Sequence, residues 1–250
     1  MTLDLVFFSL AIPAVLFAGI SKGGFGNGAA FAATPILAQI LDPALALAVM
    51  LPLLMMMDAA AVPAYWRKWH GPAVRVLLIG AVPGILIAGA VYQITDPDMF
   101  RLLIGVMALA FVGWQGARRA GWLRLPKAQF SGWKGMVFGL ISGFTSFVSH
   151  AGGPPAAMFL LPLGMNRTTY QATSVLFFWA VNLMKLMPYI VLGFFTAQSL
   201  LANLLLAPVA LLGVYIGVRA HKVMSEGLYF AITYIVLTIS GVRLIWMALG

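Results

Sequence analysis

The chain has 250 residues, of which 62% are hydrophobic and 8% are charged, and its formal net charge is +9. A soluble domain carries about 25% charged residues, so this chain has too few polar groups to cover a water-facing surface. The composition therefore excludes a soluble enzyme and predicts a membrane protein built as a single unit, residues 1–250. The basic residues are dispersed over short connections, which argues against a nucleic-acid-binding surface.

The first apolar region, Leu3–Leu41, would be nearly twice as long as the hydrocarbon core is thick if it formed one helix. Four of the six residues in Gly23–Gly28 are glycine, and such a cluster cannot hold a stable helix. We therefore expect the chain to break there. The run that starts at Leu5 lacks a basic leading segment and a small-residue cleavage site. We expect it to belong to the mature protein and not to be a signal peptide.

Six further apolar segments have the length of single membrane-spanning helices. We expect these helices at about Ala44–Tyr65, Ala73–Ile94, Phe100–Gly116, Tyr170–Leu192, Ser199–Val218 and Gly227–Ala248. A second broken region, Trp133–Gly164, lies between the third and the fourth, and it is interrupted at Ser149–Pro155. One broken region followed by three spans therefore occurs twice.

The basic residues gather in three connections, which we place in the cytoplasm because positively charged loops tend to stay there. They contain Arg67, Lys68 and Arg75, then Arg118, Arg119, Arg124, Lys127 and Lys134, and finally Arg219 and Lys222. The connections at Asp96–Asp98 and Gly193–Gln198 are placed outside. This path is consistent only if each broken region returns to its starting side. Each is therefore predicted to be a helical hairpin, either re-entrant or made of two short spans, with both chain termini outside a plasma membrane that the chain crosses several times.

The two halves match at an offset of about 124 residues, which pairs Gly19 with Gly143 and Asp58 with Asn182. Because the two copies run in opposite directions, the match predicts an inverted-topology repeat, an architecture of secondary transporters that bind substrate near the bilayer midplane. The predicted fold is an all-α polytopic membrane protein with two inverted repeats, each a glycine-broken helical hairpin plus three transmembrane helices. The first repeat covers 1–117, a basic cytoplasmic linker covers 118–131, and the second repeat covers 132–250. A duplicated bundle without transport is the alternative.

The two interruptions are candidate anion sites. A helix that restarts after each one exposes unpaired backbone N–H groups and the positive end of its dipole. If both interruptions dip into the membrane, the two helix N-termini converge on one point. The substrate-binding residues predicted on this basis are Gly23, Gly24, Gly26, Asn27, Gly28, Ser149, His150, Gly152 and Gly153. The alternative is that the glycines only let helices pack closely, as we expect for Gly80, Gly84 and Gly89.

Ionisable side chains within apolar segments are costly and indicate function. Lys22 and Lys185 are predicted to supply positive charge to a bound anion, with snorkelling to the interface as the alternative for Lys22. His150 could bond to the substrate or exchange a proton, or it could be a neutral histidine bonded to backbone. Asp58 is predicted to carry a proton, to pair with a lysine, or to make a purely structural contact. Asn182, its counterpart, shares a helix face with Lys185.

No metal or cofactor site is predicted. His70 and His221 lie in basic loops without acidic neighbours, and cysteine is absent. The sequence contains no nucleophile elbow, P-loop or carboxylate pair, so neither catalysis nor ATP-driven transport is expected.

The stretch Phe17–Gly28, followed by Thr34-Pro-Ile-Leu and Asp42-Pro, resembles the TauE/SafE sulfite exporter family. Gly139-Leu-Ile-Ser-Gly-Phe and Ala151-Gly-Gly-Pro-Pro are similar to the repeated motif of that family. The resemblance implies movement of sulfite, sulfoacetate, related sulfonates or thiosulfate across the plasma membrane. The second motif departs from the family pattern by having Ser149-His150 before its glycines and a proline pair after them, which leaves the substrate open.

The sequence thus predicts a secondary transporter, by resemblance an exporter, of a small sulfur-containing anion, with Asp58 and His150 as candidate proton carriers. An anion channel built from paired half-helices and a non-transporting membrane scaffold are the alternatives. The expected partners are the anion and the lipid bilayer, with no nucleic acid. A homodimer is left open.

Overall fold

The computed structural model describes residues 2–25, 30–123, 126–220 and 226–250. Within these ranges the chain is helical and contains no strand. The α-helices are α1 (Leu5–Ile20), α2 (Ala33–Leu37), α3 (Pro43–Ala61), α4 (Gly71–Ile94), α5 (Pro97–Arg119), α6 (Gly132–Ser149), α7 (Gly153–Leu160), α8 (Arg167–Val191), α9 (Ala197–Ala220) and α10 (Glu226–Leu249). A π-helical turn covers Ser21–Phe25, and 3₁₀ turns cover Ala30–Ala32, Val62–Tyr65 and Leu161–Leu163.

Seven helical segments in the described ranges are long and apolar enough to cross a membrane. Six of them lie on α3, α4, α5, α8, α9 and α10, which confirms the six spans predicted from the sequence. The seventh, Leu5–Gly24, extends α1 into the π-helical turn. The prediction of an all-α polytopic membrane protein is therefore confirmed.

The long helices α3 and α8 begin in the same way. Asp42 precedes α3 and its Oδ1 accepts from the N–H of Ala44 at 2.9 Å, while Asn166 precedes α8 and its Oδ1 accepts from the N–H of Thr169 at 2.8 Å. Such caps satisfy backbone donors that have no partner within the helix. Both helices therefore start at the position that the polar side chain sets.

Each broken region is a hairpin with one long and one short arm. In the first, α1 and the π-helical turn form the long arm, and the chain returns through Ala30–Leu37. In the second, α6 is the long arm, and the return consists of α7 with the turn Leu161–Leu163. The N–H of Ala128 donates to Pro162 O at 2.9 Å, which holds the start and the end of the second hairpin together. Because α7 has only 8 residues, about 12 Å, neither hairpin is a pair of equal short spans.

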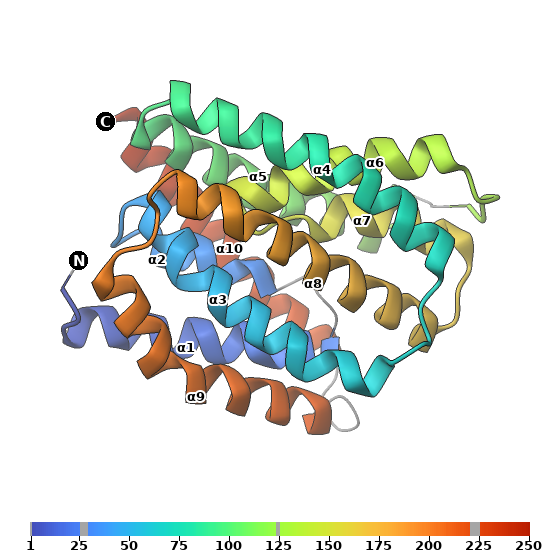
Figure 1. Ribbon diagram of the computed structural model, residues 1–250, viewed down its shortest axis with the longest axis horizontal. Helices are drawn as coiled ribbons and strands as arrows, with labels where there is room; N and C mark the ends of the chain where they lie inside the picture. The colour runs from blue at the N-terminus through green and yellow to red at the C-terminus, as the bar shows by residue number, and fades with distance from the viewer. Residues whose placement is uncertain (1, 26–29, 124–125, 221–225) are drawn as a thin grey trace.

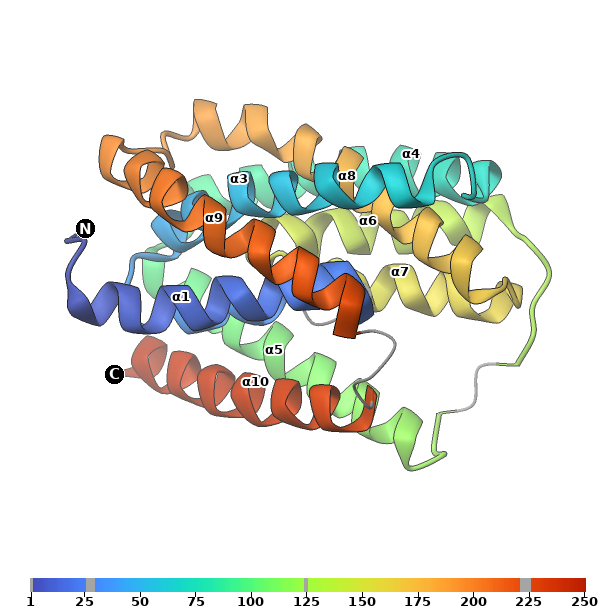
Figure 2. The ribbon, with the colours of Figure 1, turned by 90° about the horizontal axis from the view of Figure 1, so that it is seen from below.

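The helices run lengthwise through the molecule, with the N- and C-termini at the same end (Figures 1 and 2). The connections from α3 to α4 and from α5 to α6 lie at the opposite end (Figures 1 and 2). Both belong to the basic connections that the charge pattern places together. The pairs α1 and α6, α3 and α8, α4 and α9, and α5 and α10 each run in opposite directions (Figures 1 and 2). An inverted repeat requires this arrangement; the repeat itself stays a prediction.

Glycines bring the long arm of each hairpin into backbone contact with a spanning helix. A Cβ at Gly23 would lie under 3.0 Å from the carbonyl oxygen of Val214 on α9, and one at Gly139 would lie equally close to the oxygen of Leu77 on α4. Gly80 and Gly84 of α4 face the backbone of α6 in the same way. Small residues are what allows membrane helices to approach this closely. The close-packing interpretation is therefore confirmed for Gly80 and Gly84.

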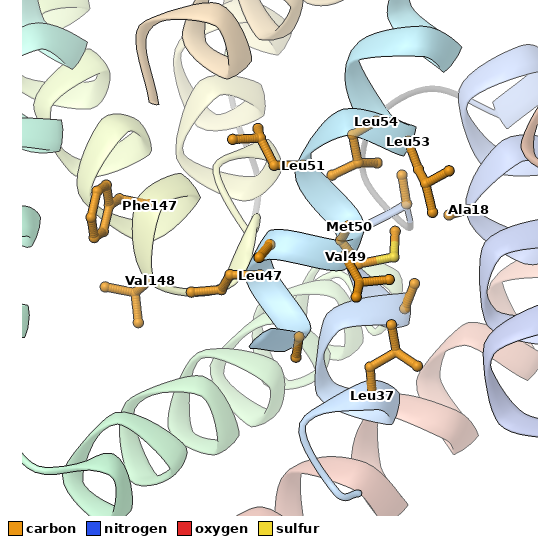
Figure 3. Packing of buried hydrophobic residues seen from close by; sticks show 14 of the residues in the cluster. Ala18, Leu37, Leu47, Val49, Met50, Leu51, Leu53, Leu54, Phe147 and Val148 are labelled. Carbon is orange, nitrogen blue, oxygen red and sulfur yellow. The ribbon is translucent and has the colours of Figure 1, made fainter. Parts of the chain in front are cut away.

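Helix α3 lies at the centre of the apolar core, between the two hairpins (Figure 3). Its Leu47 is directed toward Phe147 at the end of α6, and its Leu53 toward Ala18 on α1 (Figure 3). Leu37, on the return arm of the first hairpin, packs in the same core. Any polar side chain that α3 carries in this region is consequently removed from both water and lipid.

Candidate functional site

A buried ion pair joins the first hairpin to α3. Lys22 lies in the π-helical turn and is 3% exposed, and its Nζ forms an ion pair with Oδ1 of Asp58, which is 1% exposed. The second carboxylate oxygen, Oδ2, accepts a hydrogen bond of 2.7 Å from Nδ2 of Asn182 on α8. Both oxygens of Asp58 are thus occupied, one by the first hairpin and one by the second half of the chain.

A second buried cation joins α8 to the second hairpin. Lys185 is 0% exposed, and its Nζ lies 2.9 Å from Ser146 O, 2.9 Å from Ser146 Oγ and 2.7 Å from His150 Nδ1. These three acceptors match the three donor hydrogens of an ammonium group. Unlike Lys22, Lys185 makes no ion pair within the described ranges. Its hydrogen bonds are therefore satisfied, while no carboxylate lies within ion-pair distance of its Nζ.

The hydrogen-bond pattern around His150 assigns its tautomer. Leu47 O can only accept a hydrogen bond, so with the ring proton on Nε2, 3.4 Å from that oxygen, Nδ1 is left to accept from Nζ of Lys185 at 2.7 Å. The imidazole is then neutral, as the alternative interpretation from the sequence proposes. It is bonded both to backbone and to a charged side chain, so neither of the two interpretations is complete.

The backbone at His150 has φ of 57°, in the left-handed region that a residue with a side chain rarely adopts. Its N–H donates to Ser146 O at 3.0 Å and so ends α6. The same carbonyl oxygen accepts from Lys185, and Tyr189 Oη donates to Phe147 O at 2.6 Å. Two residues of α8 therefore cover the last carbonyl groups of α6. A positive charge at a helix C-terminus is favourable, which explains why Lys185 lies there.

The offset of the predicted repeat pairs different residues of this cluster with each other. Asp58 and Asn182, which are hydrogen-bonded, are 124 residues apart. The same offset relates Lys22 to Ser146, and the acceptor of Lys185 therefore stands where the first half has its own lysine. It also relates Ala61 to Lys185. One half contributes a lysine on its hairpin, and the other contributes a lysine on its long helix.

The structure gathers five of the predicted site residues into these two neighbouring groups: Lys22, Asp58, Asn182, His150 and Lys185. Snorkelling of Lys22 to the interface is wrong, because its side chain is buried against a carboxylate. The interpretation of Asp58 as the partner of a lysine is confirmed. Asn182 and Lys185, three residues apart on α8, are both buried, as their shared helix face predicts.

The glycines at the breaks have structural contacts. Gly23 and Gly24 pack against the backbone of α9, and a Cβ at Gly152 would lie 2.8 Å from both oxygens of Ser142. Gly153 is the first residue of α7 and is buried. Close helix packing thus accounts for Gly23, Gly24 and Gly152, although the sequence favoured an anion site there.

Ser149, another predicted site residue, does not join the cluster. Ser149 Oγ donates to Thr145 O at 3.2 Å and lies 3.3 Å from the sulfur of Met107, on the side of α5. Gly26, Asn27 and Gly28 lie outside the described residues, so the expected start of a helix near Gly28 stays a prediction. The helix that follows the first break within the described ranges, α2, has 5 residues. The convergence of two helix N-termini also stays a prediction.

Sequence reasoning missed Ser146, Ser142 and Tyr189 as parts of the site. Ser142 Oγ donates to Gly152 O at 2.6 Å and fixes the turn between α6 and α7. Ser146 could have been found from the repeat, since it stands at the matched position of Lys22. Tyr189 stands near the end of an apolar segment and therefore resembles an aromatic residue at the membrane interface. In the structure it is fully buried.

No three His, Asp or Glu side chains come together as a metal site anywhere in the described ranges. The ionisable residues of the cluster are two cations, one carboxylate and one neutral imidazole, buried where α3 and α8 meet the hairpins. Such a set can hold an anion and can move a proton.

The family model described as sulfite exporter TauE/SafE matches residues 11–244, which is nearly the whole chain. No curated protein and no solved structure matches it. The match includes most of the first hairpin, the whole second hairpin and all the residues of the buried cluster, and it agrees with the multi-pass helical membrane fold. The chain belongs to the TauE/SafE sulfite exporter family.

Proposed function

We propose that the chain is a secondary transporter that carries a small sulfur-containing anion, such as sulfite or an organosulfonate, out across the plasma membrane. The family supports the sulfur chemistry and the direction. The observation that carries the proposal is the buried ammonium of Lys185, whose three bonded partners are all neutral.

A cation that is fully removed from water is strongly unfavourable unless an opposite charge compensates it. Lys22 has this compensation in Asp58. For Lys185, the end of α6 offers only the partial negative charge of a helix C-terminus. A small anion beside Lys185 would supply the missing charge. We therefore propose that the anion binds at the junction of α8 with the second hairpin.

The two hairpins supply the parts that would move in alternating access. Lys22 and His150 lie at the breaks of the first and the second hairpin, and each contacts a polar side chain of a long helix. The bond between Asp58 and Asn182 joins those long helices, α3 and α8, to each other. Rocking the hairpins against the α3–α8 pair would open the site to one side of the membrane and then to the other.

His150 is the proposed proton carrier. Its Nδ1 is held by the ammonium of Lys185 at 2.7 Å, and a nitrogen in that position cannot accept a proton. An anion that draws Lys185 away would free Nδ1 to be protonated near neutral pH. Anion binding and proton uptake would then be linked through one side chain.

Counterflow in proteoliposomes tests the proposal. Labelled sulfite outside should exchange against unlabelled sulfite inside, and the exchange should saturate. Conductance that does not saturate, without exchange, would favour an anion channel. Uptake equal to that of empty liposomes across a panel of anions would favour a non-transporting scaffold.

A matched pair of variants connects this activity to the site. Lys185→Met removes the buried cation, whereas Lys134→Met removes an exposed lysine near the start of α6. Exchange should be lost in the first variant and retained in the second. Equal exchange in both would remove Lys185 from the proposed site.

A further inference from the structure

We infer that the site binds its anion as a monoanion and that Asp58 determines this preference. The inference rests on the proposed function for the transport itself. Hydrogensulfite and simple alkanesulfonates meet the requirement. Sulfate, thiosulfate and the dianion of sulfoacetate do not, unless a proton comes with them. The substrate class therefore follows from a balance of buried charges.

Four buried side chains determine the charge of the site. Within the described ranges, the buried residues with basic or acidic side chains are Lys22, Asp58, His150 and Lys185. Lys22 and Asp58 form an ion pair, so their charges cancel. His150 is neutral because its Nδ1 accepts from Lys185. Lys185 alone contributes an uncompensated charge, and the sum is one positive charge.

The partners of Lys185 are compatible with its ammonium form, which the inference requires. Ser146 O is a carbonyl oxygen and can only accept, and His150 Nδ1 accepts as well once the ring proton lies toward Leu47 O. The hydroxyl oxygen of Ser146 can accept the third hydrogen, so all three hydrogens of an ammonium group have a neutral acceptor.

Lys22 is not available to a second negative charge. Its Nζ is engaged by Asp58, and Asp58 is held in turn through its other oxygen by Asn182 at 2.7 Å. Freeing Lys22 would leave the buried carboxylate without its cation. A dianion at Lys185 would therefore bring one uncompensated negative charge into a site of low dielectric, where such a charge is costly.

Asp58→Asn tests the balance with little change in shape, since the second half carries asparagine at the matched position, Asn182. The variant raises the sum of the buried charges from one to two positive charges. We expect the affinity for thiosulfate relative to methanesulfonate to rise at least about tenfold. The double variant Lys22→Ser with Asp58→Asn places in the first half the residues that the second half has, Ser146 and Asn182. The double variant returns the sum of the buried charges to one positive charge and should restore the preference for methanesulfonate.

The pH dependence of the wild-type protein provides a measurement that needs no variant. Sulfite changes from monoanion to dianion near neutral pH, whereas methanesulfonate stays a monoanion. The ratio of the affinity for total sulfite to the affinity for methanesulfonate should fall as the pH rises through that ionisation. A titrating protein group such as His150 would change both affinities together and leave their ratio unchanged.

Two results would overturn the inference alone: wild-type protein that binds thiosulfate as tightly as methanesulfonate, or Asp58→Asn that binds anions with an unchanged ratio. The first result overturns the inference alone even where the wild-type protein exchanges sulfite in proteoliposomes, because the exchange would then not depend on the charge of the anion. Absence of any anion binding or exchange by the wild type would instead overturn the proposed function and the inference together.

Discussion

The carboxylate of Asp58 on α3 accepts a hydrogen bond of 2.7 Å from the side-chain amide of Asn182 on α8, and the two residues are 124 positions apart. The predicted repeat has the same offset, so under that prediction the two halves meet through the same position of each. Asp58 is also the partner of Lys22. The pair therefore connects the first hairpin, through α3, to the helix that carries Lys185.

Removing the amide should destabilise the protein. In Asn182→Leu, Oδ2 of Asp58 loses its donor and stays buried, and an unsatisfied buried group costs about 1–3 kcal/mol, more when it is charged. The midpoint of thermal unfolding in detergent should fall. Leu183→Ala, at the neighbouring and half-exposed position, is the control. Equal midpoints for the two variants would show that the hydrogen bond contributes nothing to stability.

Helix packing predicts opposite results for two glycines in helix interiors. In Gly139→Ala the new Cβ would lie under 3.0 Å from the backbone of Leu77, so α6 must separate from α4. Such overpacking typically costs about 1–3 kcal/mol. Gly113→Ala meets nothing within 4 Å and should leave the unfolding midpoint unchanged or raise it. A tolerated Gly139→Ala would mean that α4 and α6 are not in backbone contact.

The orientation in the membrane can be measured by single-cysteine labelling, because the chain has no cysteine of its own. A membrane-impermeant maleimide should label Gln198→Cys in intact cells and Ala128→Cys only after permeabilisation. Both positions are exposed. The positive-inside rule places the basic connection around Ala128 in the cytoplasm. Labelling of Gln198→Cys only after permeabilisation would contradict the predicted inverted repeat.

Proton coupling should depend on His150. In His150→Asn the side chain still offers an acceptor near Lys185, and asparagine tolerates the left-handed backbone at this position. It cannot take up a proton near neutral pH. Counterflow should therefore remain, whereas accumulation of sulfite driven by a pH gradient should be lost. Accumulation at the wild-type level would show that another group carries the proton.

The sequence was sufficient for the spans and the hairpins because both depend on strong, one-dimensional signals. Apolar segments of spanning length predicted the six helices α3, α4, α5, α8, α9 and α10, and the distribution of Arg and Lys required two hairpins. The unequal arms could not be predicted. The length of α7 depends on how it packs within the bundle. In Leu3–Leu41 the charged residue Lys22 stands at the midpoint, which does not indicate a short return arm.

The ionisable residues of the site were also visible in the sequence, since Lys22, Asp58 and Lys185 stand out in apolar segments. Their pairing was not visible, because Asp58 could have met either lysine. The packing of α3 between the hairpins places Lys22 beside Asp58, whereas Lys185 contacts Ser146 and His150. The role of the glycines could not be predicted for a related reason. Close helix packing and an anion site both require glycine, and at Gly23 the contact with α9 is visible only in the structure.

The central claim is that the charge of Lys185 is compensated by the transported anion. Thermal unfolding of purified wild-type protein, Lys134→Met and Lys185→Met, each with and without methanesulfonate or sulfite, tests it most directly. A ligand that binds the native state raises the midpoint by mass action, so both anions should raise it in the first two proteins. Lys185→Met, folded by its size-exclusion profile, should show no shift. A shift of wild-type size in Lys185→Met would contradict the account.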